Sequence, residues 1–134
     1  MKDLGIILGI RPDVIRASKI IRLLSENKNI TYDFIWSGQH YSENMKDVFF
    51  KQLNVPKPDV EFEIDTTNDA STVSSVIKNT FNHLENNKYQ AVVFLGDTNT
   101  VMGSIGAAQH NIPIVHIEGC MRSYDWRMPE EKYR

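Results

Sequence analysis

The chain has 134 residues, 41% of them apolar, with 15 basic and 17 acidic side chains and a formal net charge of −2. This length and apolar content predict one compact domain with its own core and argue against a disordered chain. The nearly balanced charge argues against a nucleic-acid or membrane-surface partner. A single cysteine, Cys120, excludes an intramolecular disulfide, and no run approaches the ~20 apolar residues that span a bilayer. We therefore expect a cytoplasmic protein.

Strand-like and helix-like segments alternate from the start of the chain. Residues 4–9 form an almost wholly apolar run that ends at glycine, which is typical of a strand covered on both faces, so we place it centrally in a parallel sheet. A helix is expected from Pro12 to about Asn27, because apolar residues recur there at helical spacing and proline is tolerated at a first helical position. Residues 32–36 then predict a second strand, and residues 42–53 predict a second helix.

The alternation continues through the middle of the chain. Residues 60–64 alternate apolar and polar side chains, which predicts a half-exposed strand toward an edge of the sheet. The longest helix is expected over residues 70–86, with capping side chains from residues 66–69. Residues 91–95 predict another strand covered on both faces, in which Val93→Asp should unfold the domain.

The last elements lead to a change of pattern. A helix of small residues is expected over 102–109, able to approach the sheet closely, and a strand over 112–117. After Gly119 the periodicity stops, and we interpret residues 120–134 as a functional loop that leads into a missing continuation. The order of elements predicts a doubly wound, mainly parallel Rossmann-like α/β sheet with right-handed crossovers. Residues 1–134 would be a single, truncated domain of this kind.

Ligands of open α/β sheets bind beyond the carboxyl ends of the strands. The polar residues expected at those ends are Arg11, Gln39, His40, Asp97, Thr98, His116 and Glu118. We infer the candidate site from their shared location, because each strand end alone is ordinary.

Each of these candidate residues could have a purely structural role instead of a functional one. Arg11, in a strand-to-helix turn, could join the helix N-terminus in binding an anion such as phosphate, or could simply be solvated. Asp97 and its neighbours could cap the next helix, which the local sequence favours. His116, between two apolar residues, is typical of a core histidine with a backbone partner. Glu118, Glu130 and Glu131 could act as acid or base if a cleft gathers them, although Glu130 and Glu131 also fit a solvated charge run.

Several common catalytic motifs are absent from the sequence. Gly5 and Gly9 do not continue into a dinucleotide fingerprint or a Walker loop. One cysteine and four scattered histidines give no zinc-ligand spacing. The Gly-x-Ser-x-Gly elbow of serine hydrolases is missing as well. We therefore expect neither a metal nor a nicotinamide cofactor.

Five short motifs taken together resemble one family. They are residues 9–13, 37–40, 96–100, 116–119 and the stretch from Arg122-Ser123 through 128–131 to Arg134. Their order and spacing are similar to those of the non-hydrolysing UDP-N-acetylglucosamine 2-epimerases, over essentially the whole chain. The resemblance implies the first of two Rossmann-like domains that face each other across a nucleotide-sugar cleft, as in B-type glycosyltransferases, with the C-terminal domain absent here.

The resemblance also implies an activity. Members of this family interconvert UDP-N-acetylglucosamine and UDP-N-acetylmannosamine by eliminating UDP and adding it back, for surface polysaccharide precursors. Asp97, Glu118 and Glu130 carry over as catalytic carboxylates. The remaining carried-over residues are Arg11 and Arg134, near the diphosphate, and Gln39 and His40, where some bacterial members bind a regulatory UDP-N-acetylglucosamine. The resemblance implies a UDP-sugar substrate, no cofactor, a homodimer in the full-length form, and no activity for this piece alone.

Some positions depart from the usual family motifs. Ile10 and Asp13 stand where the first motif usually has threonine and glutamate, and Arg16 replaces its lysine, which keeps the charge but changes the geometry. Gly119 lies one place earlier than the usual glycine, and Tyr133 replaces an asparagine. These departures leave the three carboxylates in place. Those at Ile10, Gly119 and Tyr133 slightly favour an alternative, a non-catalytic α/β remnant or partner-binding module, which the downstream coding region would distinguish from an enzyme.

Overall fold

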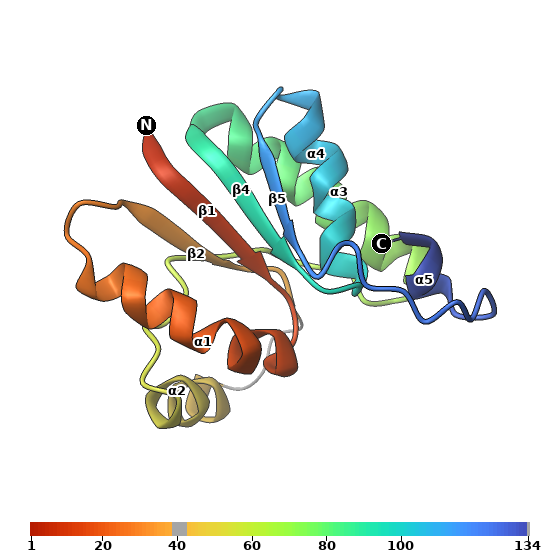
Figure 1. The fold of residues 1–134 in the computed structure, drawn as a ribbon. Coiled ribbons are helices and arrows are strands. Elements are labelled where there is room, and N and C mark those ends of the chain that lie inside the picture. The colour runs from red at the N-terminus through yellow and green to blue at the C-terminus, as the bar shows by residue number, and fades with distance from the viewer. Residues whose placement is uncertain (39–42, 134) are drawn as a thin grey trace.

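The computed structural model describes residues 1–38 and 43–133 as a five-stranded sheet flanked by helices (Figure 1). All strand pairs are parallel, and the strands lie in the order β3-β2-β1-β4-β5. In chain order the elements are β1 (Lys2–Leu8), α1 (Arg11–Glu26), β2 (Tyr32–Trp36), α2 (Glu43–Gln52), β3 (Val60–Glu61), α3 (Asp69–Asn86), β4 (Tyr89–Leu95), the 3-10 helix η1 (Asn99–Met102), α4 (Gly103–Gln109), β5 (Ile114–Ile117) and α5 (Pro129–Tyr133).

The strand order is that of a doubly wound sheet. β1 lies at the centre, between β2 and β4, as its apolar sequence predicts. The chain moves outward from β1 through β2 to β3 and then crosses back to place β4 on the other side of β1. Because right-handed crossovers in opposite directions put their helices on opposite faces, α1 and α2 lie on one face and α3 and α4 on the other (Figure 1). The predicted Rossmann-like class is confirmed.

Each face of the sheet packs against its helices through a separate apolar core. The core on the α1 side consists of Ile6, Leu8, Val14, Ala17, Ile21, Phe34, Trp36, Phe49, Phe50, Val55 and Leu95. The core on the α3 side consists of Ile7, Ile35, Phe62, Leu84, Tyr89, Val92, Phe94, Val101, Ala107 and Ile112. Successive residues of β1 enter opposite cores, because side chains alternate across a strand. β1 is therefore covered on both faces, as predicted.

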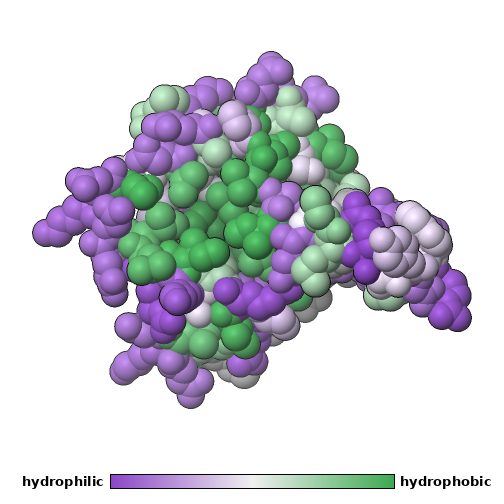
Figure 2. Space-filling view, viewed as in Figure 1, coloured by the Kyte–Doolittle hydropathy of each residue, from purple (hydrophilic) through white to green (hydrophobic). Residues whose placement is uncertain are grey.

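One part of the sheet on the α1 side is open to solvent. Val93 pairs in register with Ile6 and with Val115, so these three side chains point to the same face. Ile6 is 3% exposed, Val93 is half-buried and Val115 is 47% exposed, so burial falls from β1 toward β5. Figure 2 shows a broad hydrophobic area on the face seen in Figure 1. The expected covering of both faces of residues 91–95 therefore holds for Val92 and holds only in part for Val93, which packs against the edge of the α1-side core.

The small-residue helix α4 makes its closest approach to α3. A Cβ atom on Gly106 would lie 2.9 Å from the backbone nitrogen of Phe81 and 3.0 Å from the carbonyl oxygen of Ile77. Both atoms belong to α3, and a backbone cannot move aside as the end of a side chain can. The small residues thus allow a close approach, but at Gly106 the neighbour is α3 on the same face of the sheet, where the prediction was the sheet itself.

One strand is much shorter than the sequence predicts, and one helix is additional. β3 has two residues where the pattern of 60–64 predicts five, although its position at the edge is as expected. The reason lies in its neighbour: β2 ends at Trp36, which pairs with Glu61, and the amide of Phe62 makes the next bond to the Trp36 carbonyl at 2.8 Å. No strand lies beside the following residues among those described. The short helix α5 was not expected, because five residues are too few to show a helical period.

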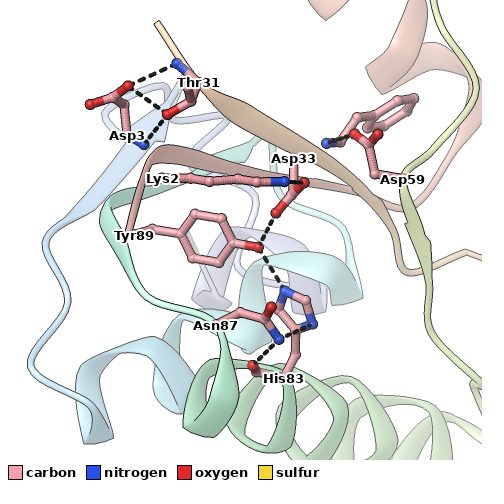
Figure 3. A network of polar contacts seen from close by, with 9 residues as sticks. Lys2, Asp3, Thr31, Asp33, Asp59, His83, Asn87 and Tyr89 are labelled. Atoms are coloured by element: carbon pink, nitrogen blue, oxygen red, sulfur yellow. Dashed lines mark hydrogen bonds and ion pairs between the residues drawn. The ribbon is translucent and has the colours of Figure 1, made fainter.

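A polar network joins the amino-terminal ends of three strands to the end of α3 (Figure 3). The ammonium of Lys2 pairs with Asp33, and the hydroxyl of Tyr89 donates to the other oxygen of Asp33 at 2.6 Å. Because the hydroxyl proton of Tyr89 is already donated to Asp33, Nε2 of His83, 2.8 Å away, must donate the hydrogen bond to the Tyr89 oxygen. Nδ1 of His83 then accepts from the amide of Asn87 at 3.4 Å. The network therefore needs a neutral His83.

The stability of the fold is expected to decrease as pH falls through the range of this histidine. Burial lowers the pKa of His83, although the charge of Asp33 opposes the shift. Below the ordinary histidine value of 6.5 the unfolded chain binds a proton that the folded state resists, so acidification favours unfolding. His83→Gln should cost about 1 kcal/mol near neutral pH and flatten this dependence. Urea unfolding of both proteins between about pH 7.5 and 5.5 tests this, and equal slopes would contradict it.

Candidate active site

The predicted site residues of β1, β4 and β5 come together at one edge of the sheet. Arg11 begins α1 after β1, Asp97 follows β4, and Glu118 follows β5, so all three lie beyond carboxyl ends of parallel strands. The connections leaving β1 and β4 turn to opposite faces here, which is the switch point where α/β sheets bind ligands. The structure thus has these residues beyond the strand ends, while their assignment to one ligand site stays a prediction. The chemical roles of the residues stay predictions.

A compact ionic cluster occupies this edge. Nη2 of Arg16 lies 2.6 Å from Oδ1 of Asp13, one turn earlier in α1, and Nη1 of Arg16 pairs with Oε2 of Glu118. Asp97 lies near enough for its charge, with that of Glu118, to raise the pKa of Asp13. Burial is the largest cause of that raised pKa, while the hydrogen bond from Arg16 acts against it. Asp13 was noted in the sequence only as a departure from a motif, and its burial could not be seen there.

The backbone at both strand ends has unusual conformations that the cluster needs. Gly96 has φ +79°, and a Cβ atom there would lie 2.9 Å from Nη2 of Arg16. Only glycine satisfies both conditions without strain. Glu118 has φ +66°, in the left-handed region that non-glycine residues seldom adopt. The turns after β4 and β5 are thus shaped around the guanidinium of Arg16.

A pocket of about 550 Å³ adjoins the switch point. Its lining is Gly9, Ile10, Ser37, Gly38, Ile64, Thr66, Thr67, Asn68, Asp69, Thr72, Val76, Thr98, Asn99 and Thr100. Neutral hydroxyl and amide groups predominate among these residues, and Asp69 is the one charged side chain among the lining residues that the structure describes. The α3 end of the pocket is fixed by Asn68, whose Oδ1 accepts from the Ser71 amide at 2.9 Å, which confirms the predicted cap.

The structure does not show the expected capping of η1 by the side chain of Thr98. Thr98 is the N-cap residue, but it makes no side-chain cap bond. Its Oγ1 is buried and has no hydrogen-bond partner among the described residues. Asp97 is half-buried beside it. The capping interpretation of the segment is therefore wrong for Thr98, which is one of the residues that line the pocket.

His116 and Arg11 each have a defined neighbour. Nε2 of His116 lies 2.6 Å from the carbonyl oxygen of Gly96, so the histidine ties β5 to the turn after β4. This confirms the structural interpretation of His116. The guanidinium of Arg11 lies 4.6 Å from the centre of the Phe49 ring in α2, a cation–π contact on an exposed side chain. Its proposed contact with an anion is not tested by this arrangement.

The two glutamates of α5 have different surroundings. Glu131 is 4% exposed and accepts hydrogen bonds from the amide and hydroxyl of Ser123, at 2.9 and 2.8 Å. The hydrogen bond from the backbone amide of Ser123 is the main cause of the lowered pKa of Glu131. The solvated charge run expected there is therefore wrong for Glu131, which holds the preceding loop. Glu130, the predicted catalytic residue, is half-buried.

Three predicted residues cannot be placed. Gln39, His40 and Arg134 lie outside the described residues, so their regulatory and diphosphate-binding roles stay predictions. Within residues 1–38 and 43–133, no three His, Cys, Asp or Glu side chains are arranged to hold a metal ion. Over the same ranges, each helix is too short or too polar to cross a bilayer.

Comparison with known proteins identifies the family. The family model described as UDP-N-acetylglucosamine 2-epimerase matches residues 22–134. The chain belongs to this family. Among curated epimerases, it is 41% identical to the UDP-N-acetylglucosamine 2-epimerase of Methanocaldococcus jannaschii, over 96% of this chain and 35% of that relative. It is 34% identical to a UDP-2,3-diacetamido-2,3-dideoxy-D-glucuronate 2-epimerase of Pseudomonas aeruginosa, over 93% of this chain and 36% of that protein.

The solved epimerase structures agree with the fold. The Methanocaldococcus jannaschii UDP-GlcNAc 2-epimerase, solved in complex with UDP-GlcNAc and UDP, has a TM-score of 0.89 and 40% identity. That match covers 98% of this chain and 36% of the other. The resemblance inferred from the motifs is thus confirmed. The chain spans about a third of the length of the epimerases that it matches.

Proposed function

We propose that the full-length form of this chain is a nucleotide-sugar 2-epimerase that interconverts UDP-N-acetylglucosamine and UDP-N-acetylmannosamine, or a close UDP-amino sugar. The observation that carries the proposal is the gathering of Asp97, Glu118 and Arg16 at the switch point of a chain that belongs to the epimerase family. Surface-polysaccharide precursor synthesis, a homodimer and a cytoplasmic location belong to the same proposal.

The chemistry requires a base beside a departing diphosphate. A hydrogen on C2 of the sugar is weakly acidic until the C1–oxygen bond to the diphosphate loosens and C1 becomes electron-poor. A carboxylate then removes the C2 proton, the C1–C2 double bond forms, and UDP leaves with the electron pair of the C1–oxygen bond. Return of a proton to the opposite face of C2, with re-addition of UDP to C1, gives the epimer. Groups that can transfer a proton are needed on two sides of the sugar, because the proton leaves one face and arrives at the other.

The residues of the chain supply such groups. Asp97, Glu118 and Glu130 are the carboxylates that we assign to proton transfer or to stabilising charge at C1. Arg11 and Arg134 are the cations that we assign to the diphosphate. The adjoining pocket of about 550 Å³ is lined mainly by hydroxyls and amides, which suits the neutral sugar better than the diphosphate.

Epimerisation is expected from the full-length form and not from the 134-residue chain alone. The chain spans about 35% of the length of the Methanocaldococcus relative, so about two thirds of that relative's length has no counterpart in it. Proton NMR of the anomeric signals, with UDP-N-acetylglucosamine as substrate, measures the reaction directly. Epimerisation by the 134-residue chain would contradict the expected inactivity.

The full-length form decides between an enzyme and its alternative. If it converts neither UDP-N-acetylglucosamine nor the diacetamido glucuronate that the Pseudomonas relative is named for, the proposed function is wrong. A stop codon directly after the chain would instead support the non-catalytic module.

A further inference from the structure

We propose that Arg16 is a positioning residue, which holds the carboxylate of Glu118 in place for the reaction, and that the buried Asp13 holds Arg16. This inference rests on the proposed function, in which Glu118 is a catalytic carboxylate. It assigns to Arg16 a role other than contact with the substrate.

The guanidinium of Arg16 bridges two carboxylates from distant parts of the chain. Nη2 bonds Oδ1 of Asp13 at 2.6 Å, and Nη1 pairs with Oε2 of Glu118, which is 102 residues away in sequence. The two nitrogens have a fixed spacing within one planar group. Once one nitrogen is held, the direction of the other is set. The bridge therefore fixes the carboxylate of Glu118, in the turn after β5, relative to α1.

Asp13 is the fixed end of this bridge. Its side chain is 1% exposed, whereas those of Arg16 and Glu118 are 41% and 26% exposed. Its other oxygen, Oδ2, is buried and has no hydrogen-bond partner among the described residues. Arg16 thus supplies the hydrogen bond that offsets the burial of Asp13, and losing it would leave a buried carboxylate without compensation. The guanidinium is consequently held at the Asp13 end and reaches outward to Glu118.

Glu118 needs such a support because its own backbone is strained. Its φ of +66° lies in the left-handed region that residues with a Cβ atom seldom adopt, and such conformations persist where surrounding contacts impose them. The contact from Arg16 is one of those constraints. Gly96 allows it, since any side chain at that position would meet Nη2 of Arg16.

A different role for Arg16 has a different kinetic signature. An arginine that binds the diphosphate would contribute to substrate affinity as well as to the departure of UDP, so its loss would raise KM in addition to lowering kcat. An arginine that only fixes Glu118 affects the geometry of proton transfer, so its loss lowers kcat and leaves KM nearly unchanged. Lysine at this position keeps the charge but has one nitrogen, which cannot reproduce the planar bridge.

The first test is the kinetics of Arg16→Lys and Asp13→Asn in the full-length form. Each is expected to lower kcat by about 10- to 100-fold, with less than about a twofold change in KM. Arg22→Lys is the matched control, because Arg22 lies in the same helix and bonds the carbonyl oxygen of Leu53 at 3.4 Å, outside the cluster. A clearly raised KM in Arg16→Lys, with or without a lower kcat, would overturn the proposal.

The second test needs no substrate and no turnover. In nitrogen-15 arginine-labelled protein, the guanidinium protons of Arg16 are expected to exchange with water more slowly than those of Arg127, which pairs with Asp125 but is 90% exposed. Asp13→Asn and Glu118→Gln should each shift the NMR signals of Arg16 and leave those of Arg127 in place. Exchange equally fast at both arginines would show that the bridge does not exist. If the bridge is observed but the full-length form does not epimerise, the proposed function fails and the bridge stands as a structural contact.

Discussion

Asp97→Asn, Glu118→Gln and Glu130→Gln are each expected to lower turnover of the full-length form by about two orders of magnitude or more. Each substitution keeps the size of the side chain and removes its ability to take or hold a proton as a carboxylate does. Asp97 and Glu118 lie at the carboxyl edge of the sheet, close enough to Asp13 for both charges to raise its pKa. Such groups act on the transition state, so their loss should appear in kcat.

The control for the carboxylate variants replaces a glutamate outside the predicted site by glutamine. Glu85→Gln changes an exposed carboxylate near the end of α3, far from the predicted site in the fold, and should keep the wild-type rate. Anomeric proton NMR gives the turnover, and thermal unfolding followed by circular dichroism shows that each variant is folded. Near wild-type rates for all three carboxylate variants would end the catalytic assignment.

Val92→Asp is expected to prevent folding of the domain. Val92 is 0% exposed, in the core on the α3 side, and it pairs in register with Gly5 and Ile114. An aspartate there would be cut off from water without a cation to pair with. The cost of an unpaired buried charge is several kcal/mol, against a total stability of about 5–15 kcal/mol for a typical domain.

The same strand pair offers a graded control for this prediction. Val115→Asp places the same charge in β5, at a side chain that is 47% exposed on the opposite face, and should leave the protein folded. Val93→Asp, expected from sequence to unfold the domain, should fall between the two because Val93 is only half-buried. Circular dichroism and urea unfolding rank the three. A cooperative transition for Val92→Asp at nearly the wild-type midpoint would contradict the argument.

Local sequence patterns determined most of the architecture. The apolar run of residues 4–9 indicates the central strand, because a strand covered on both faces has apolar side chains throughout. The helical spacing of apolar residues between Pro12 and Asn27 indicates α1, because one stripe of that helix is buried. Once strands and helices alternate, the rules of parallel sheets place the ends of β1, β4 and β5 on one edge. The positions of Arg11, Asp97 and Glu118 at that edge follow from these rules without any coordinates.

Only the tertiary structure decided which of these side chains meet and which are buried. The bridge from Asp13 through Arg16 to Glu118 joins residues up to 105 positions apart, with the carboxylates at positions 13 and 118. β3 is short because β2 ends beside it, and Glu131 is buried because the loop before α5 folds over it. A periodic pattern reports only which residues of one short segment face the same side. These contacts and burials depend on groups that are far apart in sequence and that folding brings close together.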